Sequence, residues 1–206
     1  MGDERRAEGA DPKTRRGKAS RERLVKAAVQ AVADRGIHQL RVDDVLASVG
    51  SSKSQMYHYF ADRDGLVEAA VADRCTEYLG QLGPAFASVS TLADLTALLR
   101  QFAADYAREL SGCPIGTLAS ELTSGPDRAR RIVVDAFATW EGYLAGALER
   151  IQAAGDLGTD ADPGRLALAL LTALEGGMFL SQVRGEPAPL ETALGAALDY
   201  LARLRQ

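Results

Sequence analysis

The sequence predicts an all-α protein of about nine helices, and three observations support this prediction. Alanine and leucine are abundant among the 206 residues, whereas aromatic residues make up only 6%, a composition that favours helices over sheets. From Ser20 onward, apolar residues recur at the three- and four-residue spacing of amphipathic helices. No β-hairpin signal or internal repeat stands out. We expect an N-terminal three-helix domain over residues 20–65 and a larger helical domain over residues 66–206.

The N-terminal part divides at clear signals. Residues 1–19 are charged and lack apolar periodicity, so we expect a flexible basic arm. A helix then starts at Ser20 and stops at Gly36. Two short helices are expected over residues 42–49 and 52–59, because apolar residues keep helical spacing on both sides of a Gly-Ser turn.

Glycine and proline mark the helices of the larger domain. Gly112-Cys113-Pro114 and Gly125-Pro126 interrupt the apolar pattern, and Pro163 fits the first turn of a helix. The last turn lies at residues 185–189. The six expected helices cover residues 62–82, 92–110, 114–123, 126–151, 163–184 and 190–204.

Charge is distributed unevenly along the chain. The formal net charge is −4, but residues 1–60 carry 12 Lys/Arg against 8 Asp/Glu, whereas the remainder carries 12 against 20. Such a division suggests two parts with different partners. Two cysteines do not make a disulfide framework, and the polar N-terminus has no signal-peptide core, which favours the cytoplasm. The most apolar run, Leu166–Leu180, contains Glu175 and is too short to span a bilayer, so no membrane partner is expected.

The two short helices and their glycine turn describe a helix-turn-helix, whose second helix enters the DNA major groove. The second helix offers small or polar groups that bind base edges or phosphates, namely Ser52, Lys53, Ser54, Gln55, Tyr57 and His58. Met56, Tyr59 and Phe60 are expected to face the core. The alternative is an ordinary polar surface helix. Residues 13–26 favour the DNA interpretation, because they carry seven Lys/Arg against Glu22 alone.

The segment Arg23–Val71 resembles the N-terminal domain of TetR-type transcriptional regulators. The matching positions are Ala27-Ala28, Gly36, Asp44-Val45, Gly50, Ser52-Lys53, Tyr57-His58-Tyr59-Phe60 and Asp62–Leu66. Three positions depart from the usual pattern: Arg41 replaces Ser or Thr, Ser54 replaces a common Gly, and Arg63 replaces a common Lys. A second segment, Ser111–Leu122, resembles the LmrA/YxaF-type branch, whose members often regulate drug-efflux or catabolic genes.

The resemblance implies a homodimer that binds a palindromic double-stranded DNA operator and releases it when a small-molecule effector binds the C-terminal domain. Tilting of the helix that starts near Asp62 would connect the two events. The residues expected to contact DNA are Arg15, Arg16, Lys18, Arg41, Ser52, Lys53, Ser54, Gln55, Tyr57, His58 and Arg63. We expect an apolar or aromatic effector, and we expect no cofactor.

Apolar and aromatic residues of the middle helices offer an effector pocket, although ordinary core packing is the alternative for each of them. The candidates are Tyr78, Phe102, Tyr106, Cys113, Leu118, Phe137, Trp140 and Phe179. Glu121 and Glu175 lie in apolar surroundings and either orient a ligand or satisfy a helix end or an arginine. The last two helices are apolar on more sides than one core needs, which predicts a dimer surface through Leu174, Gly177, Leu190, Leu194 and Leu201.

Two other functions are alternatives to a DNA-binding regulator: a helical enzyme that uses the apolar cavity, and an adaptor that binds only protein. The sequence has no zinc-protease motif, glycine-rich phosphate loop or clustered metal ligands. Of the two histidines, His38 lies in an expected loop and His58 in the expected recognition helix. No catalytic or metal-binding residue is therefore predicted.

Overall fold

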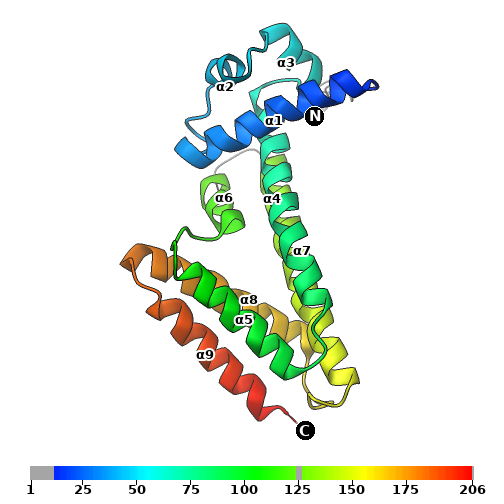
Figure 1. The fold of residues 1–206 in the computed structure, drawn as a ribbon, viewed down its shortest axis with the longest axis vertical. Coiled ribbons are helices and arrows are strands. Elements are labelled where there is room, and N and C mark those ends of the chain that lie inside the picture. The colour runs from blue at the N-terminus through cyan, green and yellow to red at the C-terminus, as the bar shows by residue number, and fades with distance from the viewer. Residues whose placement is uncertain (1–11, 124–126, 206) are drawn as a thin grey trace, which may run out of the picture. The chain divides into compact units, whose positions relative to one another are not determined.

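The computed structural model describes residues 12–123 and 127–205. Within these ranges it contains nine helices and no strand, so the predicted all-α fold is confirmed. The helices are α1 (Arg15–Arg35), α2 (Val42–Val49), α3 (Lys53–Tyr59), α4 (Arg63–Ala87), α5 (Leu92–Tyr106), α6 (Pro114–Leu122), α7 (Asp127–Ala153), α8 (Pro163–Arg184) and α9 (Ala188–Arg203). Figure 1 shows their order along the chain.

The chain forms two compact units that differ from a simple division at residue 65. The N-terminal unit extends to Thr76 and also contains Leu118–Val134. The C-terminal unit contains Glu77–Thr117 and everything from Asp135 onward. Helices α4, α6 and α7 each contribute residues to both units, so the units are joined by continuous helices and not by a linker.

Helix α1 starts earlier than its apolar pattern indicates. Thr14 caps it, because the Thr14 hydroxyl accepts a hydrogen bond from the Gly17 amide at 3.0 Å. Residues 15–19 are therefore helical, which corrects the predicted extent of the arm. The part of that arm before residue 12 lies outside the described residues.

The turn between α2 and α3 forms as predicted. Gly50 adopts a left-handed conformation with φ of 62°, which residues other than glycine rarely adopt. The Ser51 amide donates a hydrogen bond to the Leu46 carbonyl. Ser52 caps α3 by accepting a hydrogen bond from the Gln55 amide at 3.2 Å. The Gln55 side chain does not complete a capping box, since its Oε1 accepts from the Ser51 hydroxyl instead.

Two helix ends in the larger domain differ from expectation. Helix α5 ends at Tyr106 and not at Leu110, whose φ of 48° is incompatible with a continuing helix. Helix α4 continues to Ala87 and passes through Pro84, beyond the expected end at residue 82. The predicted helix start at Gly125-Pro126 falls in the interval that the structure does not describe.

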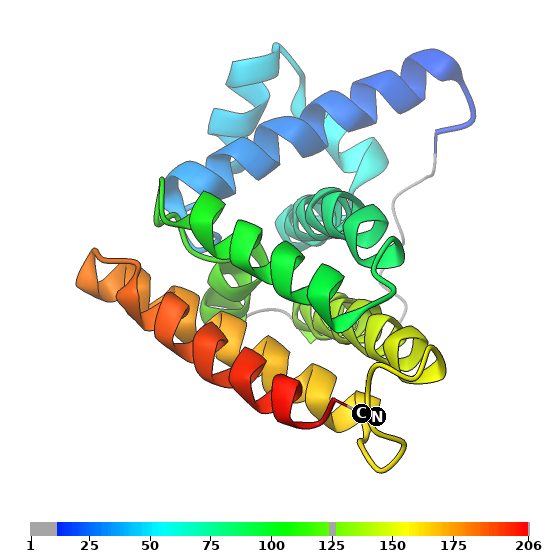
Figure 2. The same cartoon turned by 60° about the horizontal axis from the view of Figure 1, so that its bottom comes forward.

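The core of the C-terminal unit is built on one face of α7. Trp140, Leu144, Leu148 and Ile151 recur there at helical spacing, and each is at most 1% exposed. Figures 1 and 2 show α5, α8 and α9 side by side within this unit. Between α8 and α9, the Ser181 hydroxyl accepts a hydrogen bond from the Leu190 amide at 3.1 Å. That bond satisfies an otherwise unpaired amide at the start of α9.

Helix α8 spans 22 residues, longer than the 15-residue apolar run that the sequence emphasises. By length and composition alone, it is the one helix in the described ranges that meets the criteria for a membrane span, and 44% of its most apolar stretch is buried against the chain. Its outer side carries large apolar groups at high exposure. Together with Tyr200 of α9 they define an apolar patch: Leu168, Phe179, Leu180, Val183 and Tyr200.

The residues predicted for the dimer surface occupy a different place. Leu174, Gly177, Leu190, Leu194 and Leu201 are all buried within one chain, mostly in the contact between α8 and α9. A side chain that is at most 3% exposed has no surface left for a partner. The structure therefore corrects this assignment, because the wide apolar surface of α8 serves the internal contact on one side and the apolar patch on the other.

Gly177 provides a direct test of the α8–α9 contact. A Cβ atom at this position would lie 2.8 Å from the Leu190 Cα, so Gly177→Ala should lower the free energy of unfolding by about 1–3 kcal/mol through overpacking. A Cβ atom at neighbouring Gly176 meets nothing within 4 Å, so Gly176→Ala should be neutral or stabilising by about 0.5–1 kcal/mol. Urea unfolding of both variants checks this, and equal effects would contradict it.

Candidate nucleic-acid interface and buried polar cluster

Helix α3 separates its polar and apolar residues onto different faces. Met56, Tyr59 and Phe60 are 0%, 9% and 3% exposed, which confirms their predicted place in the core. The six positions predicted to read DNA are all exposed, and Tyr57 reaches 56%. They are Ser52, Lys53, Ser54, Gln55, Tyr57 and His58. A short helix anchored by its apolar face thus presents donors and acceptors to solvent.

Aromatic contacts fix the inner face of this helix. The Tyr59 ring meets the His58 ring edge-on at 5.1 Å and the Phe60 ring at 6.4 Å. The Arg21 guanidinium of α1 lies 5.2 Å from the centre of the Phe60 ring, a cation–π contact. Helix α1 therefore holds α3 through both apolar packing and a charged group.

Lys53 is paired within the protein. Its ammonium lies 2.9 Å from Asp43 Oδ1, and both side chains are about two-thirds exposed. The hydrogen bond with Asp43, together with the charge of Asp43, raises the pKa of Lys53 above its usual value. Lys53 therefore remains a cation at neutral pH, held between the start of α2 and the start of α3.

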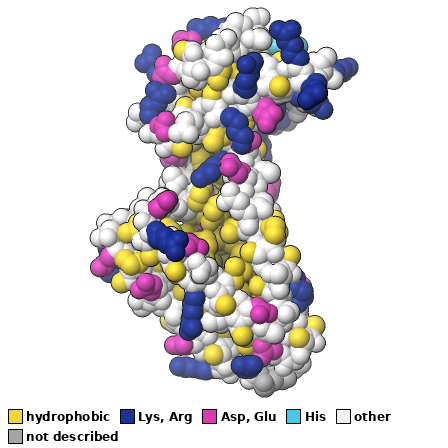
Figure 3. Space-filling view, viewed as in Figure 1, with side chains coloured by type: hydrophobic (Ala, Val, Ile, Leu, Met, Phe, Trp, Pro, Cys, Tyr) yellow, Lys and Arg dark blue, Asp and Glu magenta, His cyan; other side chains and the backbone are white. Residues whose placement is uncertain are grey.

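The N-terminal unit also carries the other basic side chains predicted to meet phosphates. Arg15, Arg16 and Lys18 are exposed in the first turns of α1, and Arg41 is exposed at the N-terminus of α2. Figure 3 shows Lys and Arg side chains gathered over the part of the molecule that contains α1–α3. This basic surface suits a phosphate backbone.

Arg63 has a structural role that the sequence did not indicate. Its Nε donates to the Leu40 carbonyl at 3.0 Å, and its Nη2 donates to the Ile37 carbonyl. Its Nη1 lies 3.4 Å from Asp64 Oδ1. The guanidinium thus holds the loop between α1 and α2, and we expect this structural role in place of the predicted phosphate contact.

Glu121 of α6 holds the same loop from the other side. Its Oε2 accepts a hydrogen bond from the Ile37 amide at 2.5 Å, and its carbonyl lies 3.1 Å from His38 Nε2. Gly36 makes room for the carboxylate, since a Cβ atom there would lie 2.6 Å from Oε2. Sequence spacing gave no sign of this contact, because the partners are 84 residues apart. Glu121 therefore satisfies the amide of a loop residue.

Aromatic side chains meet in the C-terminal unit around Trp140. Its ring contacts Tyr78 edge-on at 5.5 Å and Phe102 at 6.4 Å. One helical turn after Phe102, the Tyr106 hydroxyl donates to the Met178 carbonyl at 2.7 Å. Four of the predicted effector residues are therefore adjacent, and Trp140 Nε1 is buried without a hydrogen-bond partner among the described residues.

Buried Cys113 and partly buried Glu175 form a pair in the same unit. The thiol hydrogen-bonds to the carboxyl, and the Gly116 amide donates to the Cys113 sulfur at 3.3 Å. Burial is the main cause that raises the pKa of Cys113 and that of Glu175. Cys113 is therefore protonated at neutral pH, which removes the thiolate that redox chemistry needs. Burial also raises the pKa of the second thiol, Cys75, to about 11.

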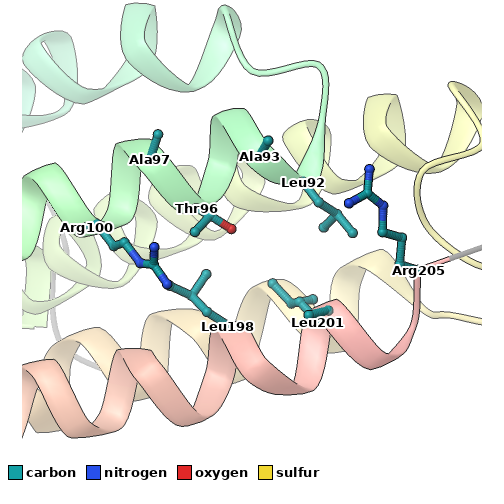
Figure 4. A pocket seen from close by; sticks show the side chains of 9 residues that line it. Leu92, Ala93, Thr96, Ala97, Arg100, Leu198, Leu201 and Arg205 are labelled. Atoms are coloured by element: carbon teal, nitrogen blue, oxygen red, sulfur yellow. The ribbon is translucent and has the colours of Figure 1, made fainter.

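Three predicted effector residues lie elsewhere or stand apart. Leu118 is buried in the N-terminal unit, and Phe137 is partly exposed on α7. Phe179 is 63% exposed and belongs to the apolar patch, which corrects its assignment to the pocket. None of the eight candidates lines the groove of about 340 Å³ between α5 and α9, which has Arg100 toward one end and Arg205 at the other (Figure 4).

Two known protein families match successive parts of the chain. Residues 24–70 match the family of bacterial regulatory proteins described as tetR. Residues 90–197 match the family described as the Tetracyclin repressor-like C-terminal domain. The first match contains α2, α3 and their turn, and the second contains the aromatic residues around Trp140 except Tyr78.

Several known proteins are similar over most of the chain. The transcriptional regulator AcuR of Cereibacter sphaeroides is 28% identical over 173 residues, which cover 82% of this chain and 79% of that protein. YxaF of Bacillus subtilis, an uncharacterised helix-turn-helix regulator, is 25% identical over 176 residues, 83% and 89% of the two chains. YxaF belongs to the branch that Ser111–Leu122 resembles.

Solved structures show the same fold. A regulatory protein TetR from Rhodobacter sphaeroides superposes with a TM-score of 0.71 at 26% identity, over 90% of this chain and 98% of that one. A TetR-family regulator from Cytophaga hutchinsonii reaches a TM-score of 0.80 at 15% identity, over 94% and 98%. The second likeness concerns the fold alone.

The position of Arg63 predicts a variant that separates folding from DNA contact. Arg63→Gln leaves the Ile37 and Leu40 carbonyls without their charged donor, so the free energy of unfolding should fall by about 1–3 kcal/mol. The salt dependence of DNA affinity should stay unchanged, because no phosphate contact is lost. Urea unfolding and binding titrations over a range of salt concentrations measure both. A shallower salt slope with unchanged stability would return Arg63 to the DNA contacts.

Proposed function

The chain belongs to the TetR family of DNA-binding transcriptional regulators, and from this premise we propose that it is a repressor that an apolar small molecule releases from a palindromic operator. This proposal depends on the six polar side chains that α3 and its Ser52 cap expose, opposite the buried Met56 and Tyr59. In a helix-turn-helix, that exposed face enters the major groove. The basic side chains of α1 and Arg41 would then contact phosphates and position the helix.

Lys53 and Gln55 are the side chains best suited to read bases. Gln forms a bidentate pair with adenine, whereas Lys binds guanine or a phosphate. In the free protein, both side chains already have partners, Asp43 and Ser51 respectively. Binding to DNA would exchange these exposed contacts for contacts with bases, which costs little because exposed ion pairs contribute little stability.

Lys53→Ala and Gln55→Ala should each weaken binding to the operator by about 1–3 kcal/mol, with no comparable loss of thermal stability. Arg184→Gln is the control, since it also removes one exposed positive charge but lies at the end of α8 in the C-terminal unit. Gel shifts or fluorescence anisotropy with the gene's own upstream region, at several salt concentrations, measure the affinity. If the wild-type protein showed no preference for this region over random DNA at moderate salt, the proposal would fail.

The apolar patch on α8 and α9 supports a homodimer. Phe179 and Val183 are 63% and 68% exposed, and Leu168, Leu180 and Tyr200 extend the patch. An exposed apolar area of this kind marks an interaction surface, and a two-fold contact between two copies is the commonest way to cover one. A symmetric pair of recognition helices would then match a palindrome.

Phe179→Glu and Val183→Glu should shift the protein from dimer to monomer and weaken operator binding, because a buried unpaired charge opposes association. Val134→Glu is the matched control, since Val134 is 57% exposed on α7 but lies outside the patch. Light scattering coupled to gel filtration reports the mass. A dimer that persists in both patch variants would place the interface elsewhere.

A further inference from the structure

Two buried polar atoms in the C-terminal unit have no hydrogen-bond partner among the described residues: Trp140 Nε1 and Glu175 Oε1. Trp140 is only 1% exposed. Buried polar groups in folded proteins are almost always paired, because an unpaired group loses its hydrogen bonds with water and gains none in exchange. Two such atoms in one unit indicate that a molecule other than the chain supplies the missing partners.

Packing contacts connect the two atoms. Phe102 of α5 packs against the Trp140 ring, and Tyr106, one turn later on the same helix, donates to the Met178 carbonyl of α8. Met178 follows Glu175 by three residues, so both lie on the same side of α8. Phe102 and Tyr106 of α5, one helical turn apart, therefore connect α7, which carries Trp140, with α8, which carries Glu175.

The neighbouring groups fix which atom donates and which accepts. An indole Nε1–H is a donor only, so it needs an acceptor. The Glu175 carboxyl receives the hydrogen bond of the Cys113 thiol, and its Oε2 lies where a Cβ atom of Gly116 would be only 2.5 Å away. Oε1 remains as an acceptor. The Tyr106 hydroxyl cannot serve it, because that proton is already donated to Met178.

The charge around the pair is one-sided. The pKa values of Cys113, Tyr106 and Glu175 are shifted by burial, by backbone hydrogen bonds and by interactions among these three side chains. No Lys or Arg contributes to these shifts. An anion placed here would face a carboxyl group without a compensating cation. A neutral donor or an ammonium group faces no such penalty.

We propose that the effector is an apolar, non-anionic molecule that donates a hydrogen bond to Glu175 Oε1 and accepts one from Trp140 Nε1. This proposal rests on the effector-responsive function proposed above and specifies its ligand. An amine or hydroxyl group supplies the donor, and an ether, carbonyl or hydroxyl oxygen supplies the acceptor. The rings of Tyr78, Phe102 and Trp140 contact the apolar body of the ligand.

Trp140 is the only tryptophan of the chain, so intrinsic fluorescence reports directly on this site. Benzylamine, benzyl alcohol and benzoate share one aromatic body and differ in charge, which makes them suitable probes. Each is titrated into the full-length protein without DNA. We expect benzylamine and benzyl alcohol to change Trp140 emission saturably, and benzoate to bind at least tenfold more weakly.

Two variants connect the binding to the named atoms. Glu175→Gln keeps the size of the side chain but removes its ability to carry a negative charge, so the preference for benzylamine over benzoate should fall at least tenfold. Glu149→Gln, an exposed carboxyl on α7, is the matched control and should leave the preference unchanged. Trp140→Phe keeps an aromatic ring without the N–H, and calorimetry should show about tenfold weaker binding of benzyl alcohol.

Three results would overturn the proposal: benzoate binding at least as tightly as the other probes, a probe preference that Glu175→Gln leaves intact, or no saturable binding of benzylamine and benzyl alcohol up to their solubility limits. Circular dichroism of each variant verifies that it is folded. Because DNA is absent from these titrations, such a result would leave operator binding untouched. Conversely, if the gel shifts showed no operator binding, the fluorescence titrations would still test the ligand preference independently.

Discussion

The burial of Met56 and Tyr59 is the contact on which the DNA-binding surface depends. Helix α3 has only seven residues, and a helix of this length is unstable alone in water. Packing of its apolar face in the N-terminal core, together with the Ser52 cap and the Gly50 turn, therefore holds the helix in place. The exposed side chains from Ser52 to His58 keep a fixed orientation only because the opposite face is packed. Stability and recognition thus use different residues of the same helix.

Local sequence signals predict much of the structure of the helix-turn-helix. The turn at Gly50, the cap at Ser52 and the inward Met56, Tyr59 and Phe60 depend on neighbours within a few residues, so spacing and residue type suffice. The start of α1 at Arg15 was missed, because the first turns of the helix are polar and only Thr14 marks the boundary. Apolar periodicity does not detect a helix end that lies in solvent.

Contacts distant in sequence were not predictable in the same way. Arg63 and Glu121 are ordinary charged residues in the sequence, yet both act on the backbone of the α1–α2 loop. The prediction of the dimer surface was wrong for a related reason. Helix α8 is apolar on several sides, and periodicity alone does not say that Leu174 and Gly177 face α9 while Phe179 and Val183 face solvent. Of the predicted effector residues, the aromatic ones around Trp140 are adjacent, because α4, α5 and α7 present them to one another.

The N-terminal unit is discontinuous in sequence, and this limits how the protein can be recombined. A fragment that ends at Thr76 would contain the whole helix-turn-helix but not residues 118–134. Its Ile37 amide would lose Glu121, and Glu68 would lose Arg128, whose guanidinium lies 4.0 Å away. A chimera that grafts this recognition helix onto another regulator therefore needs the donor's segment around α6 and the start of α7 as well. The first 76 residues therefore do not contain all the contacts that hold the DNA-binding unit together.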